Sequence, residues 1–96
     1  MRQSLQPTMK SRMKNGDCIL LTVLTAEATL LELAVEKVSL PAVKGRFMVL
    51  KNHAPVITSL HKGDITYMSG GVPGKLQIRN GFAEISDNKV TVCAEV

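Results

Sequence analysis

The chain is organised around the sequence LPAVKGRFMVLKNHAP at residues 40–55. Pro41 fixes its own φ and favours an extended residue before it, so we expect an apolar strand to end at Leu40. Gly45 can adopt a positive φ, which allows the chain to reverse before a second, short apolar strand. The Asn-His-Ala-Pro sequence at residues 52–55 predicts a rigid corner. The stretch therefore indicates a strand, a displayed loop, a short strand and a corner.

Short apolar segments separated by turn signals occupy both sides of this stretch. Strands are expected at residues 18–24, 29–40, 56–60, 65–68, 75–79, 82–85 and 90–93. Alternation of apolar and polar residues is typical of half-buried strands, and strands at this spacing without helical periodicity favour an all-β fold. We predict an antiparallel β-sandwich or flattened barrel of about eight to ten short strands.

The connections between these strands carry their own signals. The apolar phase changes at Glu36-Lys37, which predicts a β-bulge within one bent strand. Residues 69–74 are rich in glycine and proline and predict a mobile hairpin connection. Asn80-Gly81 is a strong signal for a tight hairpin turn, and Asp87-Asn88 predicts the last hairpin.

The basic charge is confined to one end of the chain. Of the net +4, all is accounted for by four cations in residues 1–16, a segment without acids or periodicity that we interpret as a disordered basic leader. Residues 17–96, the expected β-sandwich domain, hold equal numbers of basic and acidic residues and therefore no basic stripe for a phosphate backbone. With only two Phe, one Tyr and no Trp, stacking platforms for single strands are also scarce, so we expect no nucleic-acid partner.

Candidate groups for chemistry are few. His53 and His61 have no third ligand at zinc-site spacing, and no Ser or Cys lies in a nucleophile motif, so we expect neither a metal nor catalytic residues, and no cofactor. Cys18 and Cys93 are interpreted as small buried thiols, although a disulfide is possible if the first and last strands are neighbours. Without a run of 18 apolar residues, any membrane association is expected to come through a partner.

Several separated motifs together resemble one family. The run Leu-Pro-x-x-x-Gly-x-Phe-x-Val-Leu-x-x-His-Ala-Pro is followed by Leu60-x-x-Gly63, by Asn80-Gly81-Phe82-x-Glu84 and by Val-Thr-Val-Cys-Ala at residues 90–94. Over about residues 17–96 this pattern resembles the epsilon subunit of the F-type ATP synthase. We expect a short form of that subunit, natural or truncated, without the C-terminal helical hairpin of longer members.

The resemblance implies a non-catalytic subunit of the central stalk, which links the gamma subunit to the membrane c-ring and couples proton translocation to ATP synthesis. It further implies a peripheral location at the cytoplasmic face of the bacterial inner membrane, as part of the complex. Carried over position by position, the expected c-ring contacts are Val43, Lys44, Arg46 and Phe47. The expected gamma-subunit contacts are His53, Thr58 and Ser59.

Two other classes stay open from the residues alone. Lipoyl and biotinyl carrier domains are all-β, of similar size, and present a modified lysine after an acidic residue, as at Glu36-Lys37. In this chain, however, Lys37 falls inside a predicted strand without flanking turn residues. The remaining alternative is a small β-barrel binding module; in a nucleic-acid-binding form of it, the basic leader would make the contacts.

Overall fold

The computed structural model describes residues 18–96, and these residues form nine β-strands and no helix. The expected leader at residues 1–16 lies outside the described residues. The strands are β1 (Ile19–Leu24), β2 (Thr29–Val35), β3 (Lys37–Ala42), β4 (Gly45–Val49), β5 (Val56–Leu60), β6 (Gly63–Ser69), β7 (Val72–Ile78), β8 (Asn80–Ser86) and β9 (Lys89–Glu95). The described part of the chain therefore offers no helix that could cross a membrane.

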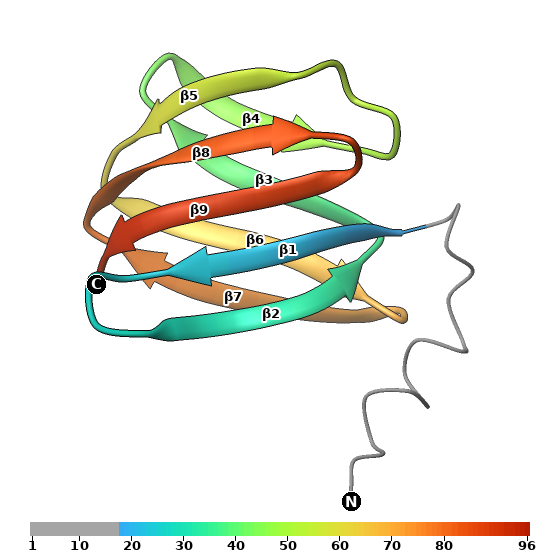
Figure 1. The fold of residues 1–96 in the computed structure, drawn as a ribbon, viewed down its shortest axis with the longest axis horizontal. Coiled ribbons are helices and arrows are strands. Elements are labelled where there is room, and N and C mark those ends of the chain that lie inside the picture. The colour runs from blue at the N-terminus through green and yellow to red at the C-terminus, as the bar shows by residue number, and fades with distance from the viewer. Residues whose placement is uncertain (1–17) are drawn as a thin grey trace, which may run out of the picture.

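The strands form two facing layers of one curled sheet (Figure 1). One layer has the order β5-β8-β9-β1-β2 and the other has the order β4-β3-β6-β7. They are joined where Leu60 of β5 pairs with Ala42 of β3. This arrangement confirms the predicted all-β sandwich or flattened barrel. One pair departs from the antiparallel prediction, because β1 and β9 run parallel. The two strands lie at opposite ends of the sequence, so no hairpin fixes their relative direction.

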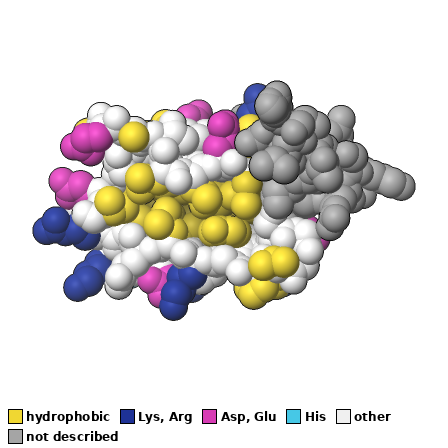
Figure 2. All heavy atoms as spheres, turned by 90° about the horizontal axis from the view of Figure 1, so that it is seen from below, with side chains coloured by type: hydrophobic (Ala, Val, Ile, Leu, Met, Phe, Trp, Pro, Cys, Tyr) yellow, Lys and Arg dark blue, Asp and Glu magenta, His cyan; other side chains and the backbone are white. Residues whose placement is uncertain are grey.

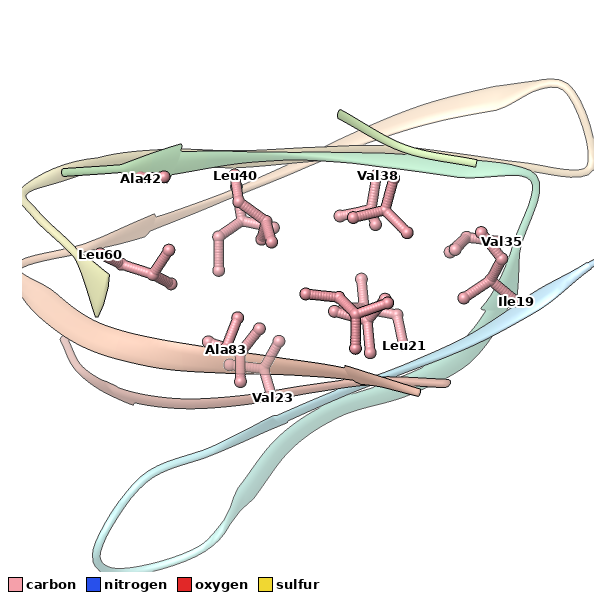
Figure 3. Close-up of a cluster of buried hydrophobic side chains, with 14 of the residues drawn as sticks. Ile19, Leu21, Val23, Val35, Val38, Leu40, Ala42, Leu60 and Ala83 are labelled. Carbon is pink, nitrogen blue, oxygen red and sulfur yellow. The ribbon is translucent and has the colours of Figure 1, made fainter. Parts of the chain in front are cut away.

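The core lies between the two layers and is aliphatic. Side chains of β1, β3 and β8 point into it from opposite sides, as Figure 3 shows for Leu21, Leu40 and Ala83. Along β1 the burial alternates residue by residue, which is the period-two pattern of a strand with one face on the core. Phe47 and Tyr67 contribute only as partly buried side chains packed against this cluster.

At two of the places where the chain passes from one layer to the other, the structure differs from what the sequence pattern predicts. Glu36 separates β2 from β3, and its N–H donates to the carbonyl of Met68 at 2.7 Å. Arg79 separates β7 from β8, and its N–H donates to the carbonyl of Glu95 at 2.7 Å. The phase change at Glu36-Lys37 is therefore a passage between layers rather than a bulge in one strand. Likewise, Asn80-Gly81 begins β8 and closes no hairpin, because β7 and β8 do not pair.

Two further predictions about prolines and glycines were wrong in detail. The strand does not end at Leu40: Pro41 lies inside β3 opposite Arg46, and its carbonyl accepts from the N–H of His61 at 3.0 Å. Because backbone groups alternate in direction along an antiparallel pair, the missing N–H of Pro41 costs β4 no bond. The glycine-rich stretch contains only a two-residue turn at Gly70-Gly71, after which Pro73 belongs to edge strand β7.

The parallel pairing of β1 with β9 also determines whether Cys18 and Cys93 can form a disulfide. Leu24, at the end of β1, lies opposite Cys93, whereas Cys18 precedes the start of β1. Six residues of strand separate Cys18 from that position, about 20 Å at the usual rise per residue. A disulfide spans about 6 Å between Cα atoms, so the two thiols cannot pair. Both are free and only partly buried.

The two layers leave two pairs of strand edges that face one another without hydrogen bonds. We name the line between β4 and β5 the upper seam and the line between β2 and β7 the lower seam, after their places in Figure 1. Seen from below, the lower seam is a strip of hydrophobic side chains bordered by charged ones (Figure 2). The upper seam carries the stretch on which the sequence prediction depends.

Candidate functional site

The β3–β4 hairpin forms one end of the upper seam. Ala42 pairs with Gly45, so the turn consists of Val43 and Lys44 alone. Gly45 has a φ of 129°, which confirms the predicted role of glycine in reversing the chain. The N–H of Val43 donates to the carbonyl of Ser59 at 3.0 Å, which ties the turn to β5. The Val43 side chain is 60% exposed, so the hairpin presents an apolar group and a cation at its tip.

Arg46, the other cation among the expected c-ring contacts, has its guanidinium hydrogen-bonded to β3 and β6. Its Nε donates to Ser39 Oγ at 2.9 Å, and its Nη2 donates to the carbonyl oxygens of Ser39 and Asp64. The guanidinium therefore reaches across β3 to β6 and fastens the edge strand β4 to these two strands of its own layer. We name this set of hydrogen bonds the arginine clamp. Lys44 and Arg46 accordingly differ: the first is a displayed charge and the second is largely committed to the fold.

The corner at residues 50–55 borders the same seam. Asn52 adopts a left-handed φ of 66°, and the N–H of His53 donates to the carbonyl of Leu50 at 3.2 Å. The imidazole meets the ring of Phe47 edge-on, with centroids 5.1 Å apart. Its Nδ1 lies 2.7 Å from the carbonyl oxygen of Ala54, so in the tautomer protonated at Nδ1 it donates there. His53 is thus held in one position beside β4, as a corner post with one side to solvent.

Strand β5 supplies the opposite wall of the seam. Adjacent residues of a strand point to opposite faces, so Thr58 and Ser59 cannot present their side chains to one flat surface. Thr58 is half-buried, whereas Ser59 is exposed. Ile57, on the same face as Ser59, is 71% exposed, more than any other large hydrophobic side chain within residues 18–96. This residue was missed as a contact candidate. The signal was available, since in the apolar pair Val56-Ile57 one member must point outward.

A single hollow of about 520 Å³ joins these parts. It is lined by Ala42, Val43, Lys44, Gly45, Arg46, Phe47, Val56, Ile57, Thr58 and Ser59. All four predicted c-ring residues and two of the three predicted gamma-subunit residues therefore lie around it, and His53 adjoins it through Phe47. Lys44 and Arg46 give the lining two cations and no carboxylate. The upper seam is thus a concave, basic and partly apolar surface.

The rest of the described surface holds less that resembles a site. A groove of about 420 Å³ is lined by residues of β3, β4, β6 and β7, among them Met48 and Met68. Within residues 18–96, no three His, Cys, Asp or Glu side chains are placed to hold a metal ion. Lys37 is the first residue of β3 and pairs with Met68 in mid-sheet, whereas a carrier lysine is displayed at a hairpin tip. The geometry therefore disfavours the carrier alternative.

Comparison with known proteins agrees with the motifs and the fold. The family model of the ATP synthase delta/epsilon chain beta-sandwich domain matches residues 18–96. The chain belongs to this family. An ATP synthase epsilon chain of Nitratidesulfovibrio vulgaris is 40% identical over 75 residues, covering 78% of this chain and 56% of the relative. One from Herpetosiphon aurantiacus is 39% identical over 77 residues, covering 80% and 57%. The chain spans about half the length of such relatives.

Solved structures share the family's fold with this chain. A chain in the cryo-EM structure of the Euglena gracilis mitochondrial ATP synthase, comprising OSCP, F1 and c-ring, matches with a TM-score of 0.76 and 22% identity, over 81% of this chain and 51% of that one. A chain from the central stalk and c-ring structure of the Tetrahymena thermophila enzyme matches with a TM-score of 0.69 and 12% identity, over 88% and 66%. At these identities the likeness establishes the sandwich itself.

Proposed function

We propose that this chain is the β-sandwich domain of a central-stalk subunit of the F-type ATP synthase, where it links the gamma subunit to the c-ring. The role is non-catalytic. The subunit is a mechanical part of the rotor, through which proton translocation is coupled to ATP synthesis. Residues 17–96 act as the attaching domain. The membership in the delta/epsilon family supports this function, and so do relatives that are ATP synthase epsilon chains.

The observation that carries the proposal is the hollow along the upper seam. Residues that the family pattern assigns to two different partners surround one concavity, because the β3–β4 hairpin and β5 meet there. We infer that the hairpin tip, with Val43 and Lys44, faces the c-ring together with the Phe47 side of β4. The corner with His53 and the face of β5 that carries Ser59 then meet the gamma subunit, whereas Thr58, also expected there, points to the other face of β5. Arg46 contributes to the ring surface mainly by holding β4 in place.

The way in which this surface is attached to the core supports the mechanical role. A tightly packed interior deforms little under load, so a surface fixed to it transmits force between partners. The arginine clamp ties β4 to β6, and the bond from Val43 to Ser59 ties the hairpin to β5. A loop that was free to swing would absorb rotation instead. In the assembled complex we place the subunit peripherally, at the cytoplasmic face of the bacterial inner membrane.

A binding titration of the 96-residue chain with the gamma subunit from the same source tests the proposal. We expect a one-to-one complex that survives size-exclusion chromatography. We also expect the gamma subunit to increase the amount of the chain that is retained on c-ring vesicles. Such an increase would agree with a bridging role. Absence of any complex between two folded proteins would overturn the proposal, and an added mass on Lys37 of the native protein would point to a carrier instead.

A further inference from the structure

Two asparagines 36 residues apart adopt left-handed backbone conformations and bind one another. Asn52 has a φ of 66° and Asn88 a φ of 60°. Asparagine is, after glycine, the residue that best tolerates this region. The N–H of Asn52 donates to Asn88 Oδ1 at 2.6 Å, and Asn88 Nδ2 donates to Asn52 Oδ1 at 3.4 Å. We name this reciprocal pair the asparagine clasp.

The Asn88 half of the clasp is fixed to the sheet. Asp87 and Asn88 form the two-residue turn between β8 and β9, closed by the pair Ser86 and Lys89. The N–H of Leu20 in β1 donates to the carbonyl of Asn88 at 3.0 Å. Asn88 therefore joins β8, β9 and β1, which lie side by side within one layer. Its side chain projects from a well-anchored point.

The Asn52 half belongs to the corner at residues 50–55, which lies outside the strands. His53 follows directly, so the backbone orientation of Asn52 determines where the imidazole points. In the orientation observed, the imidazole contacts the ring of Phe47. A hydrogen bond that fixes Asn52 from the far side of the corner thus also fixes His53 against β4.

We propose that Asn88 is a positioning residue for the partner surface: through Asn52 it holds His53 in the conformation that the gamma subunit meets. The inference rests on the proposed function for the identity of the partner. Asn88 itself acts through Asn52 and needs no contact with that partner. Preorganisation of this kind lowers the ordering cost of binding and mainly slows dissociation.

Three variants separate the clasp from the turn that contains it. Asn88→Gly keeps a residue suited to positive φ and removes the side chain, while Asp87→Gly makes the same backbone change at the neighbouring turn position, whose φ is 54°. Asn88→Asp restores an oxygen that accepts from the Asn52 N–H. In the full chain alone, we expect the Asn52 and His53 amides of Asn88→Gly to exchange hydrogen about five to ten times faster than in wild type. Asp87→Gly and Asn88→Asp should stay within about twofold of wild type, since both keep an acceptor for that N–H.

Equal exchange at Asn52 and His53 in wild type and Asn88→Gly would overturn the clasp. Binding to the gamma subunit then tests its role in recognition: Asn88→Gly should dissociate about five to ten times faster, and Asn88→Asp should recover most of the loss. Unchanged dissociation for Asn88→Gly, with wild type bound, would overturn the positioning role alone. Failure of wild type to bind, with the exchange contrast intact, would overturn the proposed function and with it the partner role of Asn88.

Discussion

The upper and lower seams are both gaps between the two layers, and different residues line them. Both are lines where two strand edges face one another unpaired. At the lower seam, Leu31, Leu33 and Leu76 are partly buried and pack against the core. Hydrophobic side chains gather along this side of the molecule (Figure 2). At the upper seam, Phe47 and Val56 also pack against the core, but the edges leave in addition a hollow with two cations around it. The lower seam is thus lined by the chain's own hydrophobic side chains, and the upper seam keeps an open hollow, which is the surface that we propose for a partner.

From this difference we infer that residues of the lower seam mainly stabilise the domain and that residues of the upper seam mainly serve recognition. A strip that packs against the core contributes to the free energy of folding, whereas an exposed side chain such as Ile57 contributes little until a partner covers it. A domain of this size buries only about 60% of its unfolded-chain surface, so it has little stability to spare. Substitutions at the lower seam should therefore change the free energy of unfolding, and substitutions at the upper seam should change binding to the partner.

The largest effect is expected at a glycine beside the corner where the chain leaves lower-seam strand β7. An ideal Cβ on Gly81 would lie 2.3 Å from the carbonyl oxygen of Cys93, and its φ is 155°. Gly81→Ala should cost about 3 kcal/mol or more in urea unfolding, because a backbone atom must move. Gly45 at the upper-seam tip also has positive φ but meets nothing within 4 Å, so Gly45→Ala should cost only about 1 kcal/mol. Similar losses for both would contradict the close contact at Gly81.

Substitutions at Leu76 and Ile57 are expected to have opposite effects on stability and on binding. Leu76→Ala at the lower seam should lower the free energy of unfolding by about 2 kcal/mol, the low end of the range for leucine truncation because the side chain is partly buried. Ile57→Ala at the upper seam should change stability by less than about 0.5 kcal/mol. The titration with the gamma subunit should show the reverse order. If Ile57→Ala binds like wild type while Leu76→Ala, still folded, binds poorly, the assignment of the two seams is wrong.

Arg46 should behave as part of the fold. Its bonds to Ser39, which is 8% exposed, and to the Asp64 carbonyl predict a loss of about 1.5 kcal/mol in thermal or urea unfolding of Arg46→Ala. Lys44→Ala, two residues away, is the matched control and should leave stability unchanged within about 0.5 kcal/mol. An Arg46→Ala variant as stable as wild type would mean that the arginine clamp contributes nothing to the folded state.

The smallest effect concerns long-range charge. Lys44→Glu should slow association with c-ring vesicles about fivefold at low salt, and the difference should shrink as salt is added, because an exposed charge acts mainly on the encounter rate. Lys75→Glu changes the net charge equally but lies on β7, and it should associate like wild type. Equal slowing by both variants would indicate that overall charge, and not the upper seam, governs the encounter.

Much of this fold could be predicted from local pattern, and what could not depends on pairing between distant strands. Alternation identified the half-buried strands, and Gly45 and Asp87-Asn88 marked turns whose φ angles require such residues. At Glu36, however, a bulge and a passage between layers produce the same phase change, so the sequence cannot distinguish them. The parallel pair of β1 and β9 and the location of Asn80-Gly81 at a strand start likewise depend on long-range pairing.

The residues of the candidate site could be named from the sequence, but their arrangement in space could not. The family pattern supplied residues from the hairpin, the corner and β5, and the structure gathers them around one hollow. The sequence does not reveal whether all of these side chains face outward. Arg46 turns back to β6, and Thr58 points away from the face of Ser59. The role of Asn88 was also hidden, because a turn residue gives no sign of a partner 36 positions earlier.

The most direct measurement of the central claim is amide hydrogen exchange across the whole chain, with and without the gamma subunit at saturating concentration. The account predicts slowed exchange on binding in β5 and the corner at residues 50–55, and little change in β2 and β7. Protection concentrated on β2 and β7, with β5 and the corner unaffected, would show that the lower seam is the partner surface and would contradict the account.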